Sequence, residues 1–357
     1  MEKDIVSTKM RITGLDVFRI FLTMLVFAFH SNIHFQCHYG ILDNFVSMGA
    51  IAMTGFFMLS GFSMFYVHKY DDMQAIVNVK KFYRKRLIGI IPSYYVIGLF
   101  YCIFCGSESV LQNLLLIPME ALGLQSAYPS SFALTHNGGT WFISCLLMCY
   151  LLFPFMKGCI EQLGAKSRFL LLGLLSGIIL YSPIVVWRFQ LGSIYSNPFF
   201  RIIEFLIGVI LAAHRKDISQ IGWLKKILYN RVLIGGEIVV LILSVSLAYD
   251  LDIGRGNYML YSWICFPVFS VMLIGLSGGV KKQNRENKIL AYFSNICYAF
   301  FLAQLFIWPI MRKIIDVVGI YDNGFKIISS FIFCTVFAVA IHEIIEKPSK
   351  KWLNSVC

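Results

Sequence analysis

A stripe of polar and ionisable side chains follows one apolar segment near the start of the chain. Asp16, Arg19, Thr23, His30 and His34 stand there among leucine, phenylalanine and valine residues. At about 100° per residue, a helix would bring all five within about 60° of one another around its axis. Arg19 and His30 would then be about 16 Å apart along that axis. One helix face would present a cation near one end and, farther along, an imidazole that can act as a general base.

Two other interpretations of this stripe stay open from spacing alone. In the first, the stripe only packs: Asp16 pairs with Arg19 at i,i+3, and His30 is hydrogen-bonded inside a bundle. In the second, the histidines at every fourth position, His30, His34 and His38, share a metal ion. Because His38 lies past the expected end of the helix, we expect no metal. Ionisable groups are costly in hydrocarbon, so the stripe must in either case face protein or water.

The composition of the whole chain is that of a membrane protein. Of its 357 residues, 58% are hydrophobic and only 14% are charged, whereas about a quarter of a soluble domain is charged. A helix needs about 20 apolar residues to cross the hydrocarbon, so the sequence predicts an all-α, polytopic fold. Ten segments qualify or nearly do: 17–35, 48–67, 88–105, 140–157, 169–187, 198–213, 232–249, 258–278, 290–311 and 325–345. Segment 107–125 carries Glu108, Pro118 and Glu120, and we expect it to be an interfacial or re-entrant helix.

The basic residues predict the orientation of these helices. With the N-terminus in the cytoplasm, 24 of the 31 lysines and arginines fall in cytoplasmic segments, as the positive-inside rule requires. An odd number of spans would destroy this asymmetry, so we expect about ten transmembrane helices with both termini cytoplasmic. The basic clusters are short and lie between apolar runs, which favours cytoplasmic loops over a nucleic-acid surface despite a net charge of +12. Since no polar linker divides the chain, we expect one transmembrane domain over residues 1–357.

Seven short motifs follow one another along the chain. The first combines Leu15-Asp16-Val17-Phe18-Arg19 with the spacing Arg19-x10-His30. The others lie at residues 56–62, 82–95, 140–143, 201–208, 297–302 and 346–348. Together and in this order they resemble the membrane-bound acyltransferase 3 family, and the resemblance covers nearly the whole chain.

The chain departs from this family pattern at three positions. The family often has two arginines three residues apart before the third-helix proline, where this chain has Arg86 and Gly89. Its tryptophan motif often includes a glutamate, where Leu146 stands here, and its ninth-helix motif usually ends in histidine, where Gln304 stands here. None of these departures affects His30.

The resemblance implies an O-acyltransferase that moves an acyl group, commonly acetyl, from cytoplasmic acyl-coenzyme A to a hydroxyl. The acceptor would be an extracytoplasmic or lipid-linked saccharide. His30 would deprotonate that hydroxyl as general base, or carry the acyl group transiently. Arg19, Arg84 and Arg86 would bind the phosphates of coenzyme A, which prefer basic side chains, with Asp16 in a supporting role. From composition alone, Arg84 and Arg86 are simply part of a basic cytoplasmic loop.

Three residues on other helices complete the expected site. Glu204 is the candidate carboxylate that orients His30 or counters its charge. Arg201 lies one turn from Glu204 and would contact the substrate, although the two could equally pair only with each other. Trp141 could stack on a sugar ring, or it could be an anchor at the membrane interface.

A different class of function remains as the alternative. A multispan transporter or a lipid or polysaccharide flippase would use intramembrane charges for a polar path without chemistry. Transporters are often built from paired halves with broken helices, and the sequence shows no paired halves. We therefore expect an acyltransferase, multi-pass in a bacterial plasma membrane, with acyl-coenzyme A as donor. Its partners would be membrane lipid and a saccharide or glycolipid acceptor.

Overall fold

The computed structural model describes residues 11–105, 109–127, 135–136, 138–191, 194–250, 262–278 and 287–356. Within these ranges the chain forms helices and no strand. The all-α prediction is confirmed.

Ten helices correspond one by one to the ten predicted segments. They are α1 (Thr13–Phe35), α3 (Ala52–Val67), α4 (Ile76–Phe104), α6 (Trp141–Gln162), α7 (Ala165–Arg188), α8 (Pro198–Gln220), α10 (Arg231–Asp250), α12 (Ser262–Ser277), α13 (Lys288–Val318) and α14 (Asn323–Ile341). Within the described ranges, eight helices are long and apolar enough to cross a membrane. The other two predicted spans are α8, which carries Arg201 and Glu204 within 23 residues, and α12, which is apolar but has 16 residues. The expected count of about ten agrees with this set.

The remaining elements are short; all but the last two, which follow α14 at the end of the chain, lie between the long helices. They are α2 (Asp43–Ser47), α5 (Val110–Ala121), α9 (Gly222–Leu228), α15 (Lys347–Val356), the 3-10 turns Gly40–Leu42, Gly49–Ile51 and Gly138–Thr140, and the π-helical turn His342–Glu346. With 12 residues, α5 is too short to cross the hydrocarbon, which needs about 20. It is therefore not an eleventh span, and the interfacial or re-entrant placement of segment 107–125 stays a prediction.

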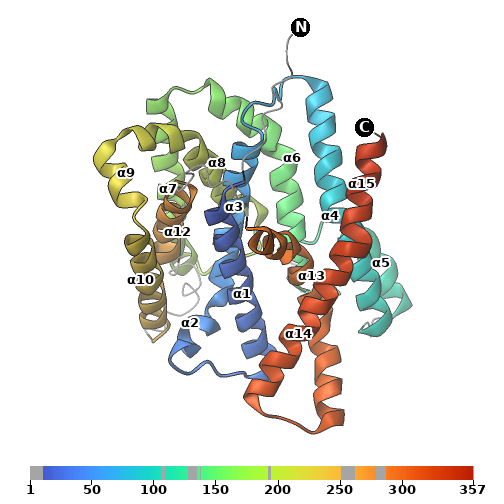
Figure 1. Cartoon of the computed structure of the whole chain (residues 1–357). Helices are drawn as coiled ribbons and strands as arrows, with labels where there is room; N and C mark the ends of the chain where they lie inside the picture. The colour runs from blue at the N-terminus through green and yellow to red at the C-terminus, as the bar shows by residue number, and fades with distance from the viewer. Residues whose placement is uncertain are drawn as a thin grey trace.

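The first and last helices of the bundle show where the two ends of the described chain lie. In Figure 1, α1 runs downward from the upper part of the molecule, and α14 and α15 run back up at the other end of the sequence. The start of α1 and the end of α15 therefore lie toward the same end of the bundle. An even number of crossings requires this arrangement.

The tightest helix contact joins α3 and α8 through two glycines. A Cβ at Gly61 would overlap the carbonyl oxygen of Phe205, and a Cβ at Gly208 would overlap that of Met58. Small residues let helix backbones approach this closely, as in helix pairs within membranes. The glycines in the 56–62 and 201–208 motifs therefore have a packing reason, because they lock α3 against α8.

Contacts on both sides of α1 fix the depth of its polar residues. On the α3 side, Leu22 meets Gly55 and Phe29 meets Gly49, so the two helices are antiparallel. On the α13 side, Asp16 accepts a hydrogen bond from Ser294, and His30 contacts Trp308, so these two helices are parallel. Residues on α3 and α13 can therefore be assigned a height along α1.

Candidate active site

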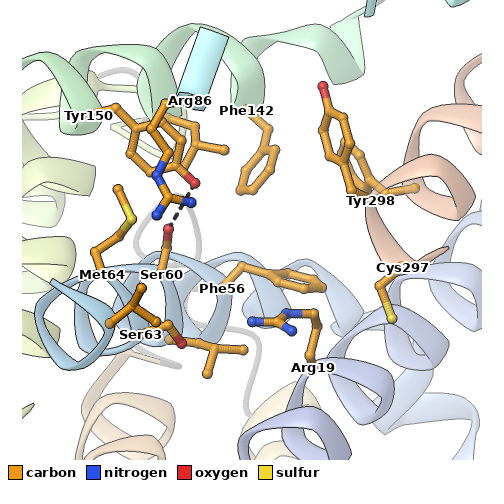
Figure 2. A pocket seen from close by; sticks show the side chains of 14 residues that line it. Arg19, Phe56, Ser60, Ser63, Met64, Arg86, Phe142, Tyr150, Cys297 and Tyr298 are labelled. Atoms are coloured by element: carbon orange, nitrogen blue, oxygen red, sulfur yellow. Dashed lines mark hydrogen bonds between the residues drawn. The ribbon is translucent and has the colours of Figure 1, made fainter. Parts of the chain in front are cut away.

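A cavity of about 290 Å³ lies among α1, α3, α4, α6 and α13. Figure 2 shows Arg19 and Arg86 extending into it from different walls. Most of the other walls are apolar or aromatic, with Phe56 and Phe142 among them. Ser60 adds a hydroxyl that lies 3.3 Å from that of Tyr150. The cavity thus combines two cations with a largely apolar lining, and it lies near the end where α1 begins.

A short network holds Arg19 at the cavity wall. Its guanidinium donates to Ser294 Oγ at 2.7 Å and lies 3.4 Å from the carboxylate of Asp16. Asp16 is buried and also accepts from Nε and Nη2 of Arg11, at 2.6 and 2.9 Å. The expected i,i+3 pair of Asp16 and Arg19 is therefore present. Because Arg11 holds Asp16 more closely, the charge of Arg19 is only partly offset and can still attract an anion.

Arg86 is held by a pair of residues, His68 and Asp71, that were not among the expected site residues. Its Nη2 lies 2.8 Å from Nε2 of His68, whose Nδ1 lies 2.6 Å from the carboxylate of Asp71. An arginine can only donate, so His68 Nε2 accepts and its Nδ1–H donates to Asp71. The guanidinium also packs on the rings of Phe82 and Tyr150, at 5.6 and 5.9 Å. The hydrogen-bond partner of the Arg86 Nη2 is thus a neutral imidazole. The Nε of Arg86 is buried without a partner among the described residues.

Arg84 is not part of this cavity. It is exposed to solvent and does not line the cavity. Two residues along a helix correspond to about 200° around its axis, so Arg84 and Arg86 lie on nearly opposite faces of α4. Arg84 and Arg86 were both expected to bind the phosphates of coenzyme A, but only Arg86 lines the cavity.

His30 lies farther along α1 and does not line the cavity. Its ring centroid is 6.3 Å from that of Trp308 and 6.0 Å from that of His34. The ring of His34 in turn stacks on Trp308 at 5.4 Å. His30 Nδ1 is buried, and no hydrogen-bond partner for it exists in the described part of the chain. The purely packed alternative, with His30 hydrogen-bonded in the bundle, is not what the structure shows for that nitrogen.

The third histidine of the metal alternative lies apart from the other two. His38 is exposed, and its Nδ1 lies 3.3 Å from Asp43. Over the described ranges, no group of three or more His, Cys, Asp or Glu side chains is placed to hold a metal ion. The repeat of histidines at every fourth position therefore does not form a common ligand set.

Glu204 lies away from His30, in a cluster of its own. Its carboxylate accepts from Arg201 at 2.7 Å and from Thr54 Oγ1 at 2.8 Å, and both charged side chains are fully buried. Since Leu22 meets Gly55 across α1 and α3, Thr54 lies about 10 Å deeper toward the start of α1 than His30 does. The structure therefore shows the alternative in which Glu204 pairs with Arg201.

Trp141 belongs to this same cluster. Its ring lies 4.5 Å from that of Tyr195, and the guanidinium of Arg201 lies over both rings, at 5.4 and 4.9 Å. Trp141 is only 5% exposed. In this conformation it is neither an anchor facing the membrane interface nor an open platform for a sugar ring, because its surface is used to pack Arg201.

Several residues that line or support the site were not expected from the sequence. Ser60 is part of the 56–62 motif, and His68 and Asp71 follow the second span at i,i+3 spacing, so these three residues carried a visible signal. Tyr150 and Trp308 gave none, because aromatic residues are common throughout membrane helices. Only the folded chain shows that these two aromatic residues meet Arg86 and His30.

Comparison with known proteins assigns the whole arrangement to a family. The sequence pattern of a family described as an acyltransferase domain matches residues 12–343. This range contains the two cavity arginines, His30 and the Arg201–Glu204 cluster. No curated protein and no solved structure is significantly similar to the chain. Because the match extends over most of the sequence and the described helices include eight able to cross a membrane, the chain belongs to the acyltransferase 3 family and is a membrane-embedded acyltransferase.

Proposed function

We propose that this enzyme transfers an acyl group, most simply acetyl, from cytoplasmic acyl-coenzyme A to a hydroxyl of an extracytoplasmic or lipid-linked saccharide. One observation carries the proposal. Two arginines face one apolar cavity at one end of α1, and the same helix carries His30 about 16 Å farther along. This arrangement fits a donor that has anionic groups at one end, near the arginines, and a reactive acyl group at the other end, near His30.

The cavity suits the donor in charge and in size. Coenzyme A carries phosphates, which arginine binds well, and the charges of Arg19 and Arg86 are only partly offset by their neighbours. A volume of about 290 Å³ is at the lower end of the range for small-molecule sites. It suits the narrow acyl-pantetheine arm and leaves the bulky nucleotide outside.

His30 supplies the chemistry in this proposal. A neutral imidazole can take a proton from the acceptor hydroxyl, or it can carry the acyl group between donor and acceptor. The unpartnered Nδ1 of His30 leaves that nitrogen available to a bound molecule. Glu204 has no direct part here, since its carboxylate is used by Arg201 and Thr54.

The lysine and arginine distribution supports the proposed orientation. The cavity end of α1 would face the cytoplasm and the His30 end would face outward, so donor and acceptor enter from opposite sides of a bacterial plasma membrane. Reporter fusions at residue 357 and within segment 106–138 should then report opposite sides. Two reporters on the same side would contradict this topology.

The test of the function uses purified protein in oriented vesicles with labelled acetyl-coenzyme A. We expect label to leave coenzyme A only when the donor is supplied at the cytoplasmic face. Modified saccharide should appear at the other face. Equal activity with donor at either face would contradict the transmembrane arrangement. Absence of transfer from any acyl-coenzyme A would contradict the donor assignment.

A further inference from the structure

Buried polar atoms without partners gather between the cavity and His30. Both side-chain polar atoms of Gln304 and the indole Nε1 of Trp308 are buried, and none of the described residues offers them a hydrogen bond. The two side chains are only 1% and 2% exposed. His30 Nδ1, in ring contact with Trp308, is in the same state.

Such groups are expensive to leave unpaired. A buried donor or acceptor without a partner costs about 1–3 kcal/mol, and most buried polar groups in folded proteins have one. Gln304 and Trp308 together contribute two donor nitrogens, which carry three N–H bonds, and one carbonyl acceptor in this condition. Their partner is therefore expected to be a molecule that enters the site.

Helix geometry places the two donors side by side. Gln304 follows Phe301, which lines the cavity, by three residues and precedes Trp308 by four. Residues at these spacings lie on one helix face. Phe27 on α1 contacts the rings of both Phe300 and Trp308, at 5.8 and 5.5 Å. Gln304 lies midway between these two residues of α13 and is therefore at about the height of Phe27, roughly one helical turn before His30. A donor arm leaving the cavity would pass this height on its way to His30.

We propose that the Gln304 side-chain N–H and the Trp308 indole N–H donate together to the carbonyl oxygen of the acyl group during transfer. This inference rests on the proposed acyl transfer. The acceptor oxygen first forms a bond to the carbonyl carbon, and the carbon–sulfur bond of the thioester then breaks. The hydroxyl proton passes to His30 and then to the sulfur of coenzyme A. In between, the carbonyl oxygen carries the negative charge that the two donors stabilise.

The surroundings suit this role because they fix the donors before the reaction. Trp308 is stacked on His34 at 5.4 Å and packed edge-on against Phe35 at 5.6 Å. Donors held in place in a water-poor site stabilise developing charge without having to reorganise. Both donors are neutral, so their burial beside His30 adds no positive charge that would disfavour protonation of His30 during the reaction.

The test replaces Gln304 with methionine, which has a similar shape and no hydrogen-bonding group of comparable strength. We expect the turnover of Gln304→Met to fall about 100- to 1000-fold, with little change in the Michaelis constant for acyl-coenzyme A. We expect Trp308→Phe, which removes the N–H and keeps an aromatic ring, to show the same pattern. The melting temperature of Gln304→Met should stay the same or rise, because an unpaired buried amide has been removed.

A second buried glutamine supplies the matched control. Gln125 is fully buried. Its Nε2 donates to the hydroxyl of Tyr94, whereas both polar atoms of Gln304 lack a partner among the described residues. The Oε1 of Gln125 also has no partner there. Gln125→Met should therefore lower the melting temperature and leave turnover per folded molecule unchanged. A lower melting temperature in Gln304→Met with normal turnover would overturn the inference, because it would show a structural role. A raised Michaelis constant with normal turnover would also overturn it, by assigning Gln304 to the donor arm.

These outcomes separate the inference from the proposed function. If the wild-type enzyme transfers acyl groups and His30→Ala does not, normal turnover in Gln304→Met refutes only the role of the two donors. If the wild-type enzyme shows no transfer from acyl-coenzyme A, the proposed function itself fails.

Discussion

Two buried polar regions of this bundle differ in how their hydrogen bonds are satisfied. In the cluster of Thr54, Arg201 and Glu204, the carboxylate accepts bonds of 2.7 and 2.8 Å, and Arg201 Nε donates to the carbonyl of Tyr195 at 2.8 Å. Around His30, in contrast, the buried polar atoms of Gln304 and Trp308 have no partner among the described residues.

This difference suggests that the Arg201–Glu204 cluster stabilises the fold, whereas the region around His30 is suited to binding a ligand. Charges buried in a membrane protein are stable only when they are paired and hydrogen-bonded. The Arg201–Glu204 cluster meets that requirement within the protein and needs nothing from outside. The polar atoms of the His30 region have no such partners among the described residues, and we propose that a bound ligand supplies them.

The largest expected effect concerns His30. His30→Ala should reduce transfer about 100- to 10,000-fold, the range of general-base catalysis, while expression and melting temperature stay near wild type. His34→Ala should cost much less, because His34 supports Trp308 without touching the reacting groups. The measurement is the initial rate of transfer by each purified variant. Equal losses from both would revive a paired-histidine mechanism.

The second effect should appear in stability. Glu204→Leu leaves the guanidinium of Arg201 buried without its countercharge, which typically costs about 3–5 kcal/mol. Adding Arg201→Met to Glu204→Leu should recover much of that loss, because the charge is then removed together with its partner. Thermal unfolding in detergent measures both. A double variant that folds normally but has lost all transfer would instead show that the cluster takes part in the reaction.

The third effect concerns the close contact that holds this cluster together. Gly61→Ala should destabilise the protein by about 1–3 kcal/mol or more, because its new methyl group would overlap the backbone of α8. Gly89→Ala is the control: no atom lies within 4 Å of the added Cβ, and alanine favours the helix by up to about 1 kcal/mol. Both changes are read from melting temperature. An undisturbed Gly61→Ala protein would mean that α3 and α8 are farther apart.

The smallest effect separates two arginines of one helix. Arg86→Ala should raise the Michaelis constant for acyl-coenzyme A about tenfold and change turnover less, because Arg86 binds a remote anionic group. Arg84→Ala should leave both nearly unchanged, since Arg84 is exposed on another face of α4. Steady-state kinetics with varied donor provide the comparison. Similar effects from both variants would point to a general electrostatic contribution of the basic cluster.

The sequence by itself determined the membrane class, the ten helical segments, the family and the polar stripe of α1. These features depend on local composition and on spacing within one segment, which the chain carries whatever its neighbours are. The i,i+3 pair of Asp16 and Arg19 is of this kind. The same local geometry also holds for Arg201 and Glu204.

Only the tertiary structure decided which of these polar groups have partners from other helices. Thr54 on α3 and Tyr195 before α8 complete the Arg201–Glu204 cluster, so Glu204 pairs within that cluster and not with His30. Gln304 looked like a departure from the family pattern, yet it lies buried on α13 between the cavity-lining Phe301 and Trp308, without a partner in the described chain. Whether a buried polar group is satisfied depends on helix packing across long sequence separations, and spacing within one segment does not encode that.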